Sequence, residues 1–121
     1  MTLALVVPSD GEKPLYLTVI DGDALTDVYR HVGCDVVEAI RPTYEGVGWH
    51  AYVDEEGALK GLPRNVRASV LAYACGRPEG SGMLVGDAVF LGENGSGEGD
   101  VPWRVVIAVK ELDYELEEEQ R

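Results

Sequence analysis

The sequence predicts an α+β fold in one domain, with a single mixed or antiparallel sheet and two short helices in the order ββαββαββ. Two observations predict this class: short β-rich apolar runs are separated by turn-forming residues, and two segments repeat apolar residues at helical spacing. The elements do not form a βαβ series, which favours α+β over a parallel α/β sheet, with both helices packed on one face of the sheet. The length of 121 residues is that of one domain, which we place at residues 1–116, with a frayed acidic tail at 117–121.

The first half of the chain is predicted to hold four strands and one short helix. Apolar runs at residues 3–7 and 15–20 flank a cluster of turn formers, which is typical of a hairpin. One face of the second run carries Leu15, Leu17 and Val19. A helix follows and ends at Gly33, a residue suited to a C-terminal cap. Further strands are predicted at residues 35–42 and 49–53.

The second half begins with another helix and a fifth strand. Pro63 stands in the predicted first turn, where a proline is tolerated because its missing N–H would have no helical partner. Four residues then recur at helical spacing and indicate the buried face of an amphipathic helix: Val66, Val70, Tyr73 and Ala74. Gly76 closes this helix. Residues 83–92 form the fifth strand, with a bulge or bend at Gly86.

The last quarter of the chain contains a predicted loop and a segment with two interpretations. Residues 92–100 are rich in glycine and acidic residues and are predicted to form a mobile loop. In residues 103–116 the apolar side chains alternate, and the β-branched content agrees with a strand, which we favour. The alternative is a helix that Asp100 caps and Pro102 starts.

The composition disfavours several classes of protein. No apolar run approaches the roughly 20 residues that cross a bilayer, and the N-terminus lacks the positive region of a secretory signal. We therefore expect a cytoplasmic protein in which Cys34 and Cys75 stay reduced. The net charge of −12, from 22 acidic and 10 basic residues, repels phosphate and disfavours direct binding to nucleic acid.

We predict no catalytic residue, no metal site and no cofactor. His31 and His50 lie beside no serine or cysteine motif, and the chain carries no phosphate-binding loop or zinc-protease signature. Asp21 and Asp23 flank Gly22 and offer the oxygen ligands that a hard cation prefers. Their position between a strand and a helix favours turning and capping instead.

A basic stretch interrupts the acidic chain. Residues 57–78 carry a charge of +4 with no acidic residue, so the other 99 residues carry −16. The second helix is predicted to start in this stretch, and its N–H groups and positive dipole end favour anions. Four residues there form a candidate anion-binding site: Lys60, Arg64, Asn65 and Arg67. In the alternative interpretation the bases pair with Asp54, Glu55, Glu56 or the acidic tail, or lie on a solvated face.

Three segments carry a family resemblance: LTVIDGDALTDVYRHVGCDVVEAI, WHAYVDEEGALKGLPRNVRAS and LVGDAVFLG. With the opening hairpin, they resemble the family called domain of unknown function 3846 over about residues 2–92. The most distinctive motifs are the Asp54–Gly57 turn, the Leu62–Asn65 helix start and the Val85–Asp87 strand. The chain departs from the family pattern at Cys34, where a second glycine is expected.

The resemblance implies a compact α+β domain and an actinobacterial, phage or plasmid setting, and it supplies no activity. It also favours a structural account of the stretch before the second helix. In that account the hairpin corner needs its glycine, and Asn65 satisfies backbone groups at the helix start.

These observations leave three hypotheses for function. The favoured one is a small non-catalytic cytoplasmic protein of a phage or mobile element that binds a macromolecular partner, host or self, through its acidic surface. Imitation of nucleic acid towards a basic partner is a special case, in which binding weakens as salt rises. The second is a small-ligand binder or enzyme that uses the basic stretch on a phosphate or carboxylate. The third is a self-assembling structural protein joined through the exposed edge of the final strand.

Overall fold

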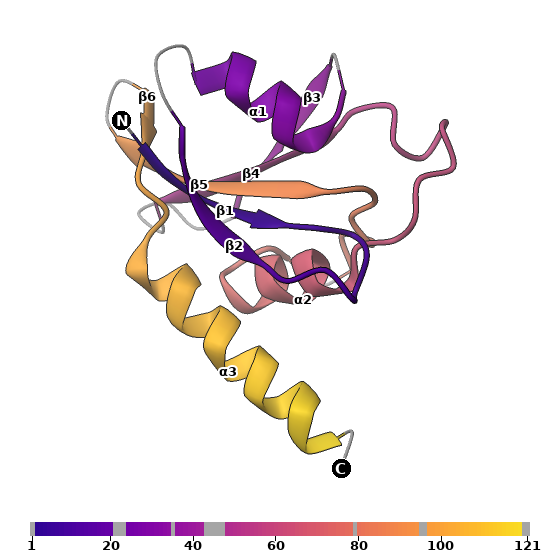
Figure 1. Ribbon diagram of the computed structural model, residues 1–121, viewed down its shortest axis with the longest axis vertical. Helices are drawn as coiled ribbons and strands as arrows, with labels where there is room; N and C mark the ends of the chain where they lie inside the picture. The colour runs from indigo at the N-terminus through magenta and orange to yellow at the C-terminus, as the bar shows by residue number, and fades with distance from the viewer. Residues whose placement is uncertain are drawn as a thin grey trace.

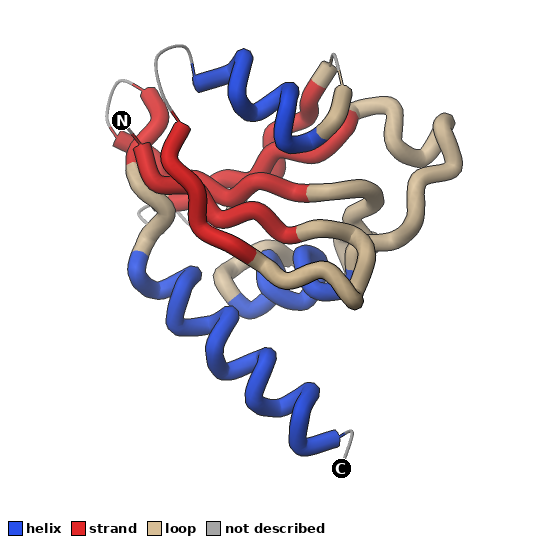
Figure 2. The backbone as a smooth tube through the Cα atoms, viewed as in Figure 1, coloured by secondary structure: helices blue, strands red, loops and turns tan. Residues whose placement is uncertain are grey.

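The computed structural model describes residues 2–20, 24–34, 36–42, 48–78, 80–94 and 97–119, and its elements follow the order ββαββαββα (Figure 1, Figure 2). The strands are β1 (Thr2–Val7), β2 (Tyr16–Ile20), β3 (Val37–Ile40), β4 (Trp49–Asp54), β5 (Ala88–Asn94) and β6 (Gly97–Gly99). The helices are α1 (Ala24–Val32), α2 (Val66–Ala74) and α3 (Trp103–Glu119). The predicted α+β class is confirmed, and the sheet is antiparallel.

The sheet consists of two hairpins joined by a central strand from later in the chain. β1 pairs with β2, β3 pairs with β4, and β5 lies between these pairs, so the strand order is β2-β1-β5-β4-β3. Phe90 of β5 lies opposite Leu5 on one side and opposite Ala51 on the other. The short β6 also pairs with β5. In this order β2 and β3 are the outer strands of the sheet.

Helices cover both faces of the sheet (Figure 1). On one face Leu5, Trp49 and Phe90 belong to a core that includes Leu71 of α2 and Val105 of α3. The core on the other face includes residues of α1 and four strands: Ala4, Val6, Ile20, Val28, Val32, Tyr52, Val89 and Leu91. The prediction that both helices pack on one face is therefore wrong. Successive residues of β1 and β5 point to opposite faces, and both faces are apolar, so each face needs a cover.

The prediction of a strand at residues 103–116, made from the alternation of apolar residues, is wrong, because this segment lies in α3. In a strand Trp103 and Val105 would share one face, but Trp103 is 71% exposed and Val105 is fully buried. Pro102 precedes the helix, and its carbonyl oxygen accepts a hydrogen bond from the N–H of Val105 at 2.9 Å. The carboxylate of Asp100 does not supply the expected cap, since it accepts from the N–H of Leu3 at 2.8 Å. This segment therefore offers no strand edge for self-assembly.

Helix α2 buries a different face from the one that its larger apolar residues indicate. Val66 is 57% exposed and Tyr73 is 54% exposed. The buried face instead carries Ala68, Ser69, Leu71 and Ala72. Small side chains allow the helix backbone to approach the sheet closely, and this favours the alanine face over the larger residues. The helix also begins at Val66 rather than at Pro63.

Secondary structure continues into the segment after Gly92. The β5 strand starts at Ala88, and β6 pairs with it inside the segment 92–100, for which a mobile loop is predicted. Before β5, Val85 forms an isolated bridge with Arg64. Helix α3 also extends through Glu119, into the tail for which fraying is predicted. The candidate cation residues at 21–23 lie outside the described residues. No helix in the described part of the chain is long and apolar enough to cross a membrane.

Candidate functional site

Asp54, the last residue of β4, binds Lys60, the first residue of the predicted anion site. Asp54 is buried, and its Oδ1 accepts a hydrogen bond from the N–H of Glu56 at 2.8 Å. Its Oδ2 accepts a hydrogen bond from the Nζ of Lys60, also at 2.8 Å. The hydrogen bond from Lys60 lowers the pKa of Asp54, and the same bond raises the pKa of Lys60. The alternative in which a base pairs with Asp54 is therefore confirmed for Lys60.

Replacement Lys60→Met is expected to destabilise the protein at neutral pH but not in acid. The pKa of Asp54 is lowered on folding, so the stability that its ionised form contributes is present above its usual value of 3.8 and is lost as the pH falls through the lowered pKa. Without Lys60, that contribution is smaller. The difference in the free energy of unfolding between the two proteins should therefore shrink as the pH falls below 3.8, measured by urea unfolding.

Lys13→Met serves as the matched control, because Lys13 is an exposed lysine of the β1–β2 loop. It should show no comparable change with pH. A Lys60→Met effect of constant size at every pH would contradict the assignment to the Asp54 pair and would indicate lost packing of the lysine stem.

Asn65 forms the structural centre of the basic stretch. It is fully buried and is the N-cap of α2, where its Oδ1 accepts a hydrogen bond from the N–H of Ala68 at 2.9 Å. Its Nδ2 donates to the carbonyl oxygens of Val7 at 2.8 Å and of Gly86 at 2.9 Å. One side chain thus joins the start of α2 to the end of β1 and to the chain before β5. This geometry confirms that Asn65 satisfies backbone groups at the helix start.

Arg67 is also bound within the chain, whereas Arg64 is exposed. The guanidinium of Arg67 donates to the carbonyl oxygens of Pro8 at 2.8 Å and of Asp10 at 2.9 Å. Arg64 pairs through its backbone with Val85. Asn65 and Arg67 therefore both bind the segment at the end of β1 and just after it, while Lys60, in the turn after β4, binds Asp54 at the end of that strand. Anion binding by these four residues stays a prediction.

Glycine at the hairpin corner has a steric reason. A Cβ on Gly57 would lie 2.7 Å from Cγ2 of Val85 and 3.2 Å from the carbonyl oxygen of Asp54. A Cβ on Gly86 would lie 2.9 Å from Cδ1 of Leu62. The short contacts at Gly57 support the glycine that the family resemblance implies at this corner. Gly86 also has a positive φ of 75°, a conformation that residues other than glycine rarely adopt.

The histidines and cysteines lie at separate places in the fold. The Tyr16 hydroxyl lies 3.4 Å from Nδ1 of His31, an exposed contact between β2 and α1. His50 is buried in β4, with its ring edge-on to Tyr52. Burial raises the pKa of the Cys75 thiol, which opposes formation of a reactive thiolate. In the described part of the chain, no group of three or more His, Cys, Asp or Glu residues is placed to hold a metal ion.

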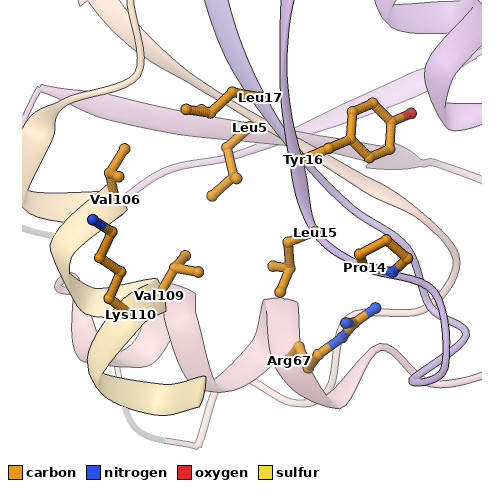
Figure 3. A pocket seen from close by; sticks show the side chains of 9 residues that line it. All are labelled: Leu5, Pro14, Leu15, Tyr16, Leu17, Arg67, Val106, Val109 and Lys110. Atoms are coloured by element: carbon orange, nitrogen blue, oxygen red, sulfur yellow. The ribbon is translucent and has the colours of Figure 1, made fainter. Parts of the chain in front are cut away.

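An open groove of about 380 Å³ lies between the β1–β2 hairpin and the helices α2 and α3 (Figure 3). It is lined by Leu5, Pro14, Leu15, Tyr16, Leu17, Arg67, Val106, Val109 and Lys110. Figure 3 shows Leu15 and Val109 on opposite sides of the opening. Most of the lining is therefore aliphatic, and the charged residues among it, Arg67 and Lys110, are both cations.

Exposed apolar residues continue from the groove along the outer strand. Leu17 is 45% exposed, and its neighbours Tyr16 and Val19 are also exposed. On α3, Trp103 and Ile107 are exposed as well. The sequence carries a signal for part of this surface, because Leu15, Leu17 and Val19 alternate on one face of the strand predicted at residues 15–20. The sequence carries no such signal for the opposite wall. That wall is formed by α3, and the alternating residues of this segment predict a strand instead.

Comparison with known proteins identifies a family and a similar fold. The sequence model of the domain of unknown function (DUF3846) matches residues 1–112, in agreement with the resemblance. No curated protein matches the chain. The crystal structure of the small RNA methyltransferase HEN1 is similar over 89% of this chain, with a TM-score of 0.62 and 16% sequence identity. This chain covers 16% of that chain, and at this identity the similarity shows the fold alone.

Proposed function

Because the chain belongs to the family described as domain of unknown function (DUF3846), a description that names no activity, we propose a function from its surface. The protein is a non-catalytic domain that acts by binding a macromolecular partner, either a host protein or a copy of itself. The partner contacts the groove between the β1–β2 hairpin and α3. The expected cytoplasmic setting, in a phage or mobile element, belongs to the same proposal.

The observation that carries the proposal is the exposure of apolar side chains around one open groove. Single exposed apolar residues are ordinary, but a contiguous apolar surface with a polar border is typical of an interaction site. Here Leu17 of the outer strand β2 lines the same groove as the aliphatic side chains of Val106 and Val109. Their burial against a partner would remove apolar surface from water, which is the main favourable term in most protein association.

The acidic surface supports the same function in a second way. A net charge of −12 attracts a basic partner over a distance and repels nucleic acid. Attraction of this kind raises the rate of association more than the affinity, and it weakens as salt screens the charges. For a host protein as partner, the groove supplies most of the affinity and the acidic surface favours encounters with a basic protein.

The test is site-specific photo-crosslinking in cells that naturally produce the full chain. A photoreactive phenylalanine replaces Leu17 at the groove, and the control places it at Leu59. Leu59 is a suitable control because it is a leucine, is 88% exposed and lies in the turn after β4, outside the residues that line the groove. We expect a defined crosslinked product from position 17 and none from position 59.

Two results would contradict the proposal. Equal crosslinking from both positions would indicate non-specific contact of exposed apolar residues. A protein that forms no product from position 17 at its natural abundance, while remaining folded by circular dichroism, would show that the groove binds no macromolecule.

A further inference from the structure

We propose that the occupant of the groove is helix α3 of a second copy of this chain, in an antiparallel pair related by a two-fold axis. This inference rests on the proposed function of the groove and names the partner. It differs from self-assembly through a strand edge, because the contact is made by a helix. Three observations carry it: the position of α3, the spacing of its residues, and the charges of the groove.

Helix α3 extends beyond the body of the domain. Its first turns pack against the sheet, where Val105 is fully buried, and Val106, Val109 and Lys110 line the groove. In Figure 1 the later turns, drawn in yellow, continue past the sheet to the end of the helix at Glu119. This part of the helix backbone is therefore positioned to reach a neighbouring molecule.

The sequence of α3 repeats two series at the spacing of paired helices. Val105, Val109, Leu112 and Leu116 follow one another at intervals of four, three and four residues, which is the spacing of a coiled-coil seam. The second series has the same intervals and begins with two residues of the groove: Val106, Lys110, Asp113 and Glu117. Each series thus continues from the half of α3 that packs on the sheet into the half that extends past it.

When two copies of α3 run antiparallel, each series on one helix meets residues of complementary charge or matching polarity on the other. With the two-fold axis near residue 111, position 110 of one copy, a lysine, comes to the level of Asp113 in the other. The same axis brings Val109 to the level of Leu112, and Leu116 to the level of Val106 at the groove. Val105 stays in the core of its own domain. A two-fold interface forms every contact twice, so one favourable ion pair in the sequence becomes two in the dimer.

The charges of the groove favour this occupant over an uncharged one. The groove carries the cations Arg67 and Lys110, whereas residues 111–119 of α3 carry six acidic residues and no basic one. Two copies with a net charge of −12 each repel at long range. At physiological ionic strength salt largely screens repulsion between charges more than about 8 Å apart, whereas the charges at the groove are in direct contact.

The first test measures self-association of the full chain by sedimentation equilibrium at physiological ionic strength. We expect wild type to be a dimer and Lys110→Glu to raise the dissociation constant by at least about tenfold, because each of two opposing pairs becomes repulsive. Arg104→Glu is the matched control. It makes the same change of charge on the same helix, at an exposed residue that does not line the groove, and it should leave the dimer intact.

The second test mixes two variants that each dimerise poorly alone and asks whether their opposite charges restore the interface in a heterodimer. In the variant Asp113→Lys/Glu117→Lys the extended part of the helix becomes more basic, so this protein should also dimerise poorly by itself. Mixed with Lys110→Glu, it should form a heterodimer. The two introduced charges attract each other at one contact, and the native pair of Lys110 with Asp113 forms at the other. Native mass spectrometry distinguishes this heterodimer from either homodimer.

Any of three results would overturn the inference: a monomeric wild type at high micromolar concentration, a dimer insensitive to Lys110→Glu, or a mixture without heterodimer. The proposed function of the groove is tested separately by the crosslink from position 17. A crosslink to a different protein, together with a monomeric wild type, would retain the binding function and reject the second copy as the partner.

Discussion

Asn65→Ala is expected to lower the free energy of unfolding by roughly 3–5 kcal/mol. Loss of an N-cap side chain costs about 0.5–2 kcal/mol, and here the N–H of Ala68 loses its acceptor. The carbonyl oxygens of Val7 and Gly86 also lose their donor. Each buried polar group without a partner costs about 1–3 kcal/mol. Urea unfolding at neutral pH measures the change, and a loss below about 1 kcal/mol would contradict a structural role for this side chain.

Asn65→Asp separates the cap from the two other bonds. An aspartate retains an acceptor for Ala68 but places a negative charge beside the carbonyl oxygens of Val7 and Gly86. Burial and these oxygens disfavour the ionised form, so the pKa of the new carboxyl should be raised on folding. The variant should therefore be strongly destabilised at neutral pH and should regain stability as the pH falls, because its protonated form can donate one hydrogen bond.

Gly92→Ala is expected to destabilise the fold by about 3 kcal/mol, the upper end of the usual cost of overpacking. A Cβ at this position would lie 2.0 Å from the carbonyl oxygen of Asp100, a backbone atom that a side-chain rotation cannot move away. Relief of the clash requires β6 and the segment before α3 to shift. That shift would disturb the hydrogen bond from the N–H of Val101 to the carbonyl oxygen of Leu3, now 2.8 Å.

Gly11→Ala is the control for this effect, because a Cβ on Gly11 would meet no atom within 4 Å. It should leave the unfolding midpoint within a few degrees of the wild-type value, or raise it slightly by restricting the unfolded chain. Thermal unfolding followed by circular dichroism compares the two variants. Equal midpoints for the two proteins would show that the chain near Asp100 moves aside at little cost.

Local patterns predicted most of the strands and both earlier helices. The β1–β2 hairpin, α1 and β4 follow directly from apolar runs and turn residues, which act over a few positions. The misassigned segment 103–116 contains both patterns. Its β-branched residues alternate as in a strand, and they also recur at helical spacing. Pro102 and the burial of Val105 against the sheet decide in favour of the helix, and the second of these depends on residues far away in the sequence.

The candidate site was less predictable than the fold. Charge and helix position predict an anion site within residues 57–78, which stays a prediction, whereas the expectation that Asn65 satisfies backbone groups there is confirmed. The acceptors of Arg67 follow β1, almost sixty residues earlier, so the local sequence does not identify them. The groove was missed because its walls are an outer strand and a helix whose assignment was wrong.

By itself, the sequence determined the α+β class, the family, the acidic charge and the need for Asn65 and glycine around the start of α2. These properties depend on composition, short-range spacing or the geometry of a single turn. Only the tertiary structure decided which face of α2 is buried, that helices cover both faces of the sheet, and that β2 and α3 border an open groove. Those features depend on which strands become neighbours in the sheet. Here β5, which comes late in the sequence, lies between β1 and β4 and so joins the two earlier hairpins. Packing between such distant segments selects among local patterns that are equally compatible with the sequence.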